Sequence, residues 1–232
     1  MTETSVVDSS ERAFASASLA SDEIGADAIG PILSDVRTTD QLSINERLQI
    51  VDYARIEATR LYIDGIIAYP STFPVDVYAA TKRMGIPVEQ AIIPGDPASG
   101  RPPAGLIFKD AGEATPHILV QKGMDSRHQL FTACHELGHY LLWMAANPSE
   151  NYADVAWGDI RPEHHHDQDH EDQRPSEYAA NTFAHMLLMP DAAVVTLLQA
   201  GKTVSELATF FGVTEKSAKR RLSYFDVGSQ TY

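Results

Sequence analysis

The segment His-Glu-Leu-Gly-His at residues 135–139 has the residue types and the spacing of a metal-dependent hydrolytic site. At about 100° per residue on a helix, His135 and His139 point the same way and can share one metal ion. Glu136 lies beside them, where its carboxylate can take a proton from a bound water. Neutral imidazoles suit Zn²⁺, which lowers the pKa of its bound water toward neutrality. We therefore predict two metal ligands, His135 and His139, and a catalytic base, Glu136.

The flanking residues predict a helix over 127–146 that presents this motif. Leu130, Leu137 and Leu141 fall together on the helical wheel, roughly opposite the two histidines. One face is expected to enter a core while the other faces a cleft, and Gly138 leaves room for close backbone approach near the ion. The alternative, two ordinary histidines on an amphipathic helix, requires identity, spacing and an apolar back face to coincide by chance.

Two histidines leave the site incomplete, because Zn²⁺ in hydrolases usually takes three protein ligands and one water. The glycine three residues and the histidine six residues after the motif, known from one zinc peptidase class, are replaced here by leucine and alanine. The third ligand must come from further along the chain. The best source is the stretch 177–190, in which Glu177 and Asn181 can share one helical face. His170 is the competing candidate.

Together the two motifs resemble those of a known family. The motif H-E-L-G-H at 135–139, followed by E-x-x-A-N-x-F-A-x-x-L-L-M-P at 177–190, is similar to the ImmA/IrrE family of zinc metallopeptidases. The segment 75–88 also resembles the opening helix and turn of that family, and the resemblance covers about residues 46–225. It implies that Glu177 is the acidic third ligand.

The resemblance also implies the fold and the function. The expected fold class is α+β, a zincin-like core of helices around a small sheet, followed by a compact helical C-terminal unit. The expected function is zinc-dependent endopeptidase activity, with Mn²⁺ as the alternative ion. The implied substrate is a partner protein, a helix-turn-helix transcriptional repressor, whose cleavage relieves repression in stress responses or mobile elements.

Composition narrows the class of protein. The chain has 232 residues and a formal net charge of −14, which disfavours global binding to nucleic acid or anionic membranes. No apolar run reaches the roughly 18 residues of a membrane helix, and no secretory signal is recognisable. Cys134 is the only cysteine, so an intrachain disulfide is excluded. We expect Cys134 to be a buried small side chain. We expect a cytoplasmic protein without membrane contact.

Three segments are expected along the chain. Residues 1–42, rich in Ser, Ala, Thr and Asp, are expected to be disordered or loosely helical. Residues 43–200 are assigned to the zincin-like metallopeptidase domain, and residues 201–232 to a helix-turn-helix-like helical segment. Within the second segment, the acidic histidine-rich loop over 149–176 is expected to be solvated, although it can also bind metal weakly or cover the cleft.

The predicted elements of the peptidase segment follow from caps and periodicity. A capping box, Ser-Ile-Asn-Glu at 43–46, opens a helix through about Asp64, and a second helix is predicted over 74–84. Two strands are predicted at 106–108 and 117–120. The second is our candidate for the sheet edge that accepts an extended substrate, and an ordinary half-buried strand is the alternative.

Helices are also predicted from Glu177 to about Met189 and from Pro190 to near Gly201. His185 lies about 80° round the wheel from Glu177 and can donate a hydrogen bond to a developing oxyanion, but a core histidine is the preferred interpretation.

The C-terminal segment has helix-turn-helix spacing, with the turn at Gly212. Its second helix is locally basic and can contact DNA phosphates through Lys216, Lys219, Arg220 and Arg221. We prefer a structural or protein-binding role because the chain as a whole is acidic. Two rivals to the peptidase remain: a DNA-binding regulator with a vestigial metal site, and a toxin–antitoxin or phage regulatory protein that acts by stable protein binding. The sequence leaves the oligomeric state undetermined.

Overall fold

The computed structural model describes residues 26–34, 37–67, 73–95, 102–108, 115–146 and 174–229. Our expectations for residues 1–25 and for the histidine-rich loop lie outside the described residues, as does the competing ligand His170.

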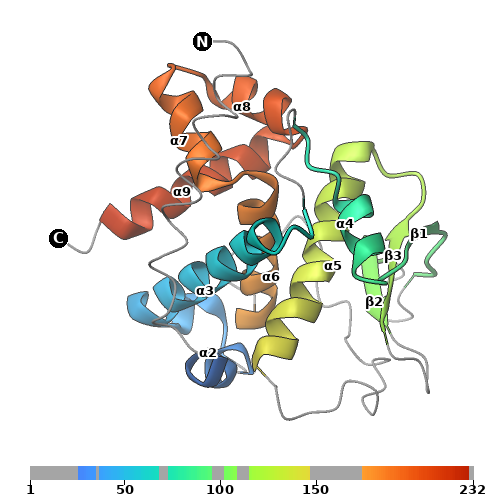
Figure 1. The fold of residues 1–232 in the computed structure, drawn as a ribbon. Helices are drawn as coiled ribbons and strands as arrows, with labels where there is room; N and C mark the ends of the chain where they lie inside the picture. Colours follow the sequence, from blue (N-terminus) through green and yellow to red (C-terminus); the bar gives the residue numbers. More distant parts are fainter. Residues whose placement is uncertain are drawn as a thin grey trace.

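Two helices at the centre of the molecule carry both motifs. Helix α5 (Ser126–Ala146) and helix α6 (Pro175–Leu188) pack side by side, and α3 (Ile44–Ile63) lies against α6 (Figure 1). Leu137 of α5 and Phe183 of α6 are fully buried, and the hydroxyl of Tyr62 donates a hydrogen bond of 2.6 Å to the carbonyl of Leu187. The two predicted motif-bearing helices are therefore confirmed, and together with the sheet described below they confirm the α+β class.

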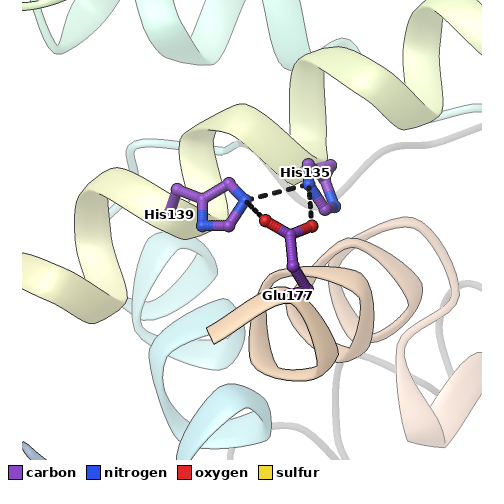
Figure 2. A group of neighbouring side chains, drawn as sticks. All are labelled: His135, His139 and Glu177. Atoms are coloured by element: carbon purple, nitrogen blue, oxygen red, sulfur yellow. Dashed lines mark hydrogen bonds and ion pairs between the residues drawn. The ribbon is translucent and has the colours of Figure 1, made fainter. Parts of the chain in front are cut away.

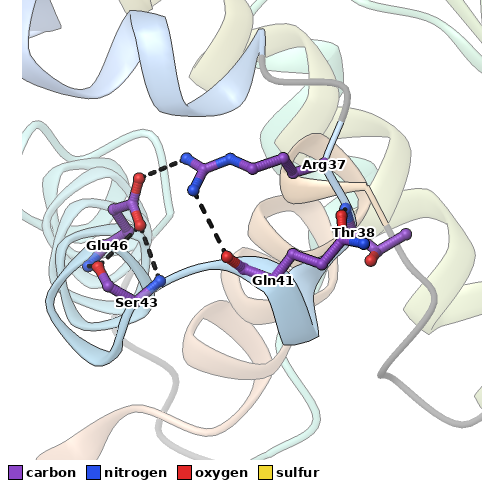
Figure 3. Close-up of polar contacts among 5 residues, drawn as sticks. All are labelled: Arg37, Thr38, Gln41, Ser43 and Glu46. Carbon is purple, nitrogen blue, oxygen red and sulfur yellow. Dashed lines mark hydrogen bonds and ion pairs between the residues drawn. The ribbon is translucent and has the colours of Figure 1, made fainter.

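The capping box predicted from sequence fixes the start of α3. The Ser43 hydroxyl accepts a hydrogen bond from the backbone N–H of Glu46, and the Glu46 carboxylate accepts one from the backbone N–H of Ser43 at 2.8 Å. Arg37 pairs with the same carboxylate and donates to the carbonyl of Gln41 (Figure 3). These contacts tie the short 3₁₀ helix Thr39–Gln41 to the first turn of α3.

An additional helix, α2 (Ala26–Leu33), precedes them and packs on α5. It lies in the segment for which we expected disorder or a loose helix. Ile29 is instead fully buried, and Leu42 is 3% exposed. This part of the segment is ordered because even a few apolar side chains, once they reach the core, remove enough surface from water to hold a short helix.

Among the described residues, the sheet has three strands in the order β1–β3–β2. They are β1 (Val88–Ala91), β2 (Gly105–Phe108) and β3 (His117–Gln121), and β3 pairs in parallel with β1 and antiparallel with β2. The predicted strands correspond to β2 and β3, whereas β1 was not predicted. The assignment of His117–Val120 to a substrate-accepting edge was wrong, because β3 is the central strand and both of its sides are already hydrogen-bonded.

One face of the sheet covers α5. Ile107, Ile118 and Val120 are buried on this face, and the helices α3 and α6 occupy the other side of α5 (Figure 1). Helix α5 is therefore covered on two sides. On the histidine face, α6 packs over His135, which is 8% exposed, while His139 and Glu177 are half-buried.

The remaining helices complete the frame. Helix α4 (Val77–Arg83) begins later than predicted because Asp76 is its N-cap, accepting a hydrogen bond from the backbone N–H of Ala79. Helices α7 (Asp191–Gln199), α8 (Val204–Phe211) and α9 (Glu215–Ser229) follow α6. Gly212 joins the last two with φ at 66°, a left-handed conformation that favours glycine.

The C-terminal helices pack on the rest of the molecule. The Phe211 ring packs edge-on against the Phe73 ring, with the ring centroids 4.9 Å apart. Tyr224 of α9 is buried against His185 of α6. In the described part of the chain, no single helix has the length and apolarity needed to cross a membrane; α6 and α7 meet that test only together, across a bend of 59°.

Candidate metal centre

The three predicted ligands come together at the contact between α5 and α6. The Nε2 atoms of His135 and His139 lie 3.0 Å apart. The Glu177 carboxylate faces both rings, with Oε2 3.4 Å from Nε2 of His135 and Oε1 3.2 Å from Nε2 of His139 (Figure 2). These ligand atoms lie within 4.8 Å of one another. Residues one helical turn apart on α5 and the first turn of α6 therefore converge on one point.

This donor set fits a single divalent ion. Zn²⁺ in a tetrahedral site binds imidazole nitrogen and carboxylate oxygen at about 2.0–2.2 Å, which places neighbouring ligand atoms about 3.3 Å apart. The 3.0 Å between the two Nε2 atoms is close to that value, and each Nε2 has its own oxygen of Glu177 nearby, at 3.4 Å for His135 and 3.2 Å for His139. Three protein ligands also leave a fourth tetrahedral position for water or substrate. Among the described residues, this is the one group of three or more metal-ligating side chains.

Close packing of the two helices brings Glu177 within reach of the histidines. A Cβ added at Gly138 would lie 2.9 Å from Cδ1 of Phe183 and 3.3 Å from both Cα and the carbonyl oxygen of Ala180. We expected the glycine to allow close approach of backbone, and the backbone that it admits belongs to α6. Gly138 therefore sets the spacing at which a carboxylate from α6 can meet two imidazoles from α5.

Asn181 orients the first histidine. Its Oδ1 lies 3.0 Å from Nδ1 of His135, so the ring donates its Nδ1–H to the amide oxygen and keeps the Nε2 lone pair for the metal. Asn181 lies one turn after Glu177 on α6, as the shared helical face predicted. The sequence pattern included this residue without revealing its role, because its partner is 46 positions away along the chain.

Glu177 is held as a carboxylate. Burial by itself would raise its pKa, but the neighbouring His139 and the polar contacts with both imidazoles lower the pKa of Glu177 well below its ordinary value. The group therefore stays charged at neutral pH and is ready to bind a cation.

Glu136 has the opposite electrostatic environment. It is 8% exposed, and burial raises its pKa to about 7, with His135 opposing the shift and Glu177 adding to it. A carboxyl group that titrates near neutral pH can both take up and release a proton, as a general acid–base catalyst must. Its Oε1 and Cγ lie against Gly105 at the start of β2, a neighbour that the sequence analysis did not identify.

Two other residues singled out from the sequence, His185 and Cys134, are buried in the protein core. His185 is 3% exposed; its Nδ1 lies 3.3 Å from the hydroxyl of Tyr224, and its ring lies 4.9 Å from that of Phe131. These contacts support the core interpretation. Cys134 is fully buried, and burial raises the pKa of its thiol, in agreement with the prediction of a buried small side chain.

A pair of histidines one helical turn apart, a carboxylate from a second helix and a buried glutamate beside the first histidine define a site of the H-E-x-x-H metallopeptidase class. The family model described as the IrrE N-terminal-like domain, peptidase M78, matches residues 97–223. The match covers more than half of the chain and includes both motifs, so the chain belongs to this family, as the resemblance indicated. Comparison with curated proteins gave no match.

Proposed function

We propose that the protein is a zinc-dependent endopeptidase that cleaves a partner protein. The observation that carries this proposal is the convergence of His135, His139 and Glu177 on one point next to the buried Glu136. A Zn²⁺ ion held by these ligands would polarise the scissile carbonyl and make water a stronger nucleophile.

Glu136 performs the proton transfers. Its carboxylate takes a proton from the attacking water and gives it to the amine nitrogen as the peptide C–N bond breaks. Glu177 cannot replace it, since both of its carboxylate oxygens are directed at the imidazoles.

The free edge of β2 is suited to hold an extended substrate. Because Ala104 accepts a hydrogen bond from Gln121 of β3, the antiparallel alternation turns the peptide groups of Gly105 and Ile107 away from β3. Within the described residues no strand pairs with β2 on that side. A substrate added there as a strand would run past Glu136.

Proteolysis is tested by comparing wild type with Glu136→Gln. Each Zn²⁺-loaded protein is incubated with a soluble bacterial proteome, and newly formed N-termini are quantified by mass spectrometry. Termini that form with wild type and not with E136Q support an endopeptidase and identify cleavage sites. Identical sets of termini from both proteins contradict it.

The proposed substrate class is a helix-turn-helix repressor, as the family resemblance implies. This part is tested by mixing purified candidate repressors with wild type or E136Q in the presence of Zn²⁺ or Mn²⁺. Fragments that require Glu136 support it. A complex that forms equally well with both proteins and never yields fragments favours the rival in which the protein acts by stable binding.

The rival of DNA binding loses support at the C-terminal helix. The Arg221 side chain is 1% exposed, with Nε donating to the carbonyl of Met189 at 2.9 Å and a second contact to Asp191. The guanidinium carbon of Arg220 lies 5.7 Å from the ring centroid of Tyr178 and 5.4 Å from that of Tyr224. Two of the four cations expected to meet DNA phosphates are therefore engaged inside the protein.

A further inference from the structure

Strand β2 approaches helix α5 closely at a glycine, Gly105. A Cβ added at Gly105 would lie 2.4 Å from Cγ2 of Thr132, 2.8 Å from Oε1 of Glu136 and 3.1 Å from Cγ of Glu136. Separations below about 3 Å do not occur between such atoms, so the two side chains already fill the space where a side chain at position 105 would be. Gly105 lies on the same face of the strand as the buried Ile107 and therefore faces α5.

The two neighbours of Gly105 differ in freedom. Thr132 is 1% exposed, and its γ-methyl sits on a helix covered by the sheet, so little space is left around it. The Glu136 carboxylate is the end of a flexible side chain and can rotate away. A methyl group at position 105 would therefore strain the contact with Thr132 and displace the carboxylate of Glu136.

The backbone of Gly105 also has a place in the substrate edge. Its peptide groups face the free side of β2, so the residue that contacts Glu136 is also one that would hydrogen-bond an added strand. Gly105 therefore lies next to the Glu136 carboxylate and would also contact the backbone of a bound substrate strand. Glycine in a strand often marks a place where another group comes close to the backbone.

We propose that Gly105 is a positioning residue for the catalytic step: its missing side chain sets the place of the Glu136 carboxylate relative to the substrate edge of β2. The inference rests on the proposed function for the role of Glu136 in proton transfer. It does not rest on the metal ligands, because the three atoms nearest to a Cβ at position 105 belong to Thr132 and Glu136.

The test separates position from stability with two single and two double variants. Thr132→Ser removes the γ-methyl nearest to position 105, so G105A/T132S relieves the clash between strand and helix but keeps the clash with Glu136. Thr132→Val keeps a methyl group there, so G105A/T132V is the matched control that should not regain stability. T132S alone is the reference. We expect G105A and G105A/T132V to lose thermal stability, and G105A/T132S to return toward T132S.

The decisive readouts compare G105A/T132S with T132S. Crystal structures should show the Glu136 carboxylate displaced from β2, with His135, His139 and Glu177 in place. Zn²⁺ affinity should be equal. On a peptide spanning the strongest cleavage site of the proteome experiment, kcat should fall tenfold or more while KM changes little.

Two results would overturn the proposal: an unmoved Glu136 carboxylate in G105A/T132S, or a kcat equal to that of T132S. If the wild type cleaves nothing, the proposed function fails, and the crystallographic comparison alone decides whether Gly105 positions Glu136. A purely structural role for Gly105 predicts that G105A/T132S regains activity together with stability, relative to G105A.

Discussion

His135 of α5 donates its Nδ1–H to Oδ1 of Asn181 of α6 over 3.0 Å, while its Nε2 faces Glu177. Helix α6 thus carries both a candidate metal ligand, Glu177, and Asn181, which orients another candidate ligand. This hydrogen bond selects the tautomer whose Nε2 carries a free lone pair.

Replacing Asn181 by alanine should weaken metal binding. Without the acceptor, the His135 ring loses its preferred orientation and tautomer, and loss of such a partner typically costs about 10- to 100-fold in affinity. Competition with a chelator of known Zn²⁺ affinity measures the change. Asn181→Asp keeps an acceptor oxygen at the same place and should retain most of the affinity. Equal affinity in N181A and wild type would show that the α5–α6 packing alone orients the ring.

Metal binding should stabilise the folded protein through the three ligands. A ligand that binds only the folded state adds about 2.7 kcal/mol at a free concentration of 100 times Kd. We expect Zn²⁺ to raise Tm, chelation to reverse the rise, and Glu177→Ala to abolish most of it. E136Q should keep the effect, since Glu136 is not a ligand.

His170→Ala is the matched control, because His170 was the competing third ligand. Elemental analysis of protein purified without added metal, with E177A and H170A alongside, measures occupancy directly. One equivalent of metal in H170A and little in E177A is the expected pattern. The reverse pattern would transfer the third-ligand role to His170.

Local signals in the sequence predicted much of the helical frame. The capping box at Ser43 located the start of α3, and the four-residue spacings of His135 and His139 and of Glu177 and Asn181 placed each pair on one helical face. Each of these signals lies within one or two helical turns. Nearest-neighbour rules are sufficient there because side chains three or four positions apart meet directly.

The sequence could not reveal relationships between distant segments. Strand β1 was missed because its residues are exposed or only half-buried, without the alternation of a strand with one covered face. The order of strands, and so the identity of the edge, depends on pairing that no local pattern encodes. The roles of Gly105 and Asn181 arise from contacts with α5 that only the folded chain creates.

Gly138→Ala should harm the protein although alanine favours a helix. The change contributes about 1 kcal/mol of helix propensity. The added methyl would meet the fully buried Phe183 ring at 2.9 Å and the backbone of Ala180 at 3.3 Å, and such overpacking costs about 1–3 kcal/mol. The backbone cannot yield without moving α6, which carries Glu177. We expect a net loss of stability in urea unfolding and a weaker Zn²⁺ affinity; a gain in both would show that α6 adapts freely.

A buried carboxyl group far from the metal ligands in sequence gives the chain a pH-dependent stability. Glu57 of α3 is 8% exposed, and burial raises its pKa above the ordinary 4.5, with Arg60 opposing the shift and Asp64 adding to it. Because the folded state holds this proton more tightly than the unfolded state, the contribution of Glu57 to stability falls as pH rises from 4.5 through the raised pKa. Above that window the folded protein bears the cost of a buried charge.

Glu57→Gln removes this titration and keeps an oxygen that can accept the hydrogen bond from Arg60. We expect E57Q to raise Tm at pH 8, by about 2–4 °C for each kcal/mol gained, and to change it little at pH 4. Thermal unfolding of both proteins across this pH range measures the difference. If Glu57 acts through its own burial, the gain at high pH should appear equally in chelated protein. Because α3 packs on α6, which carries Glu177, an effect that requires Zn²⁺ would mean that Glu57 acts through the metal centre.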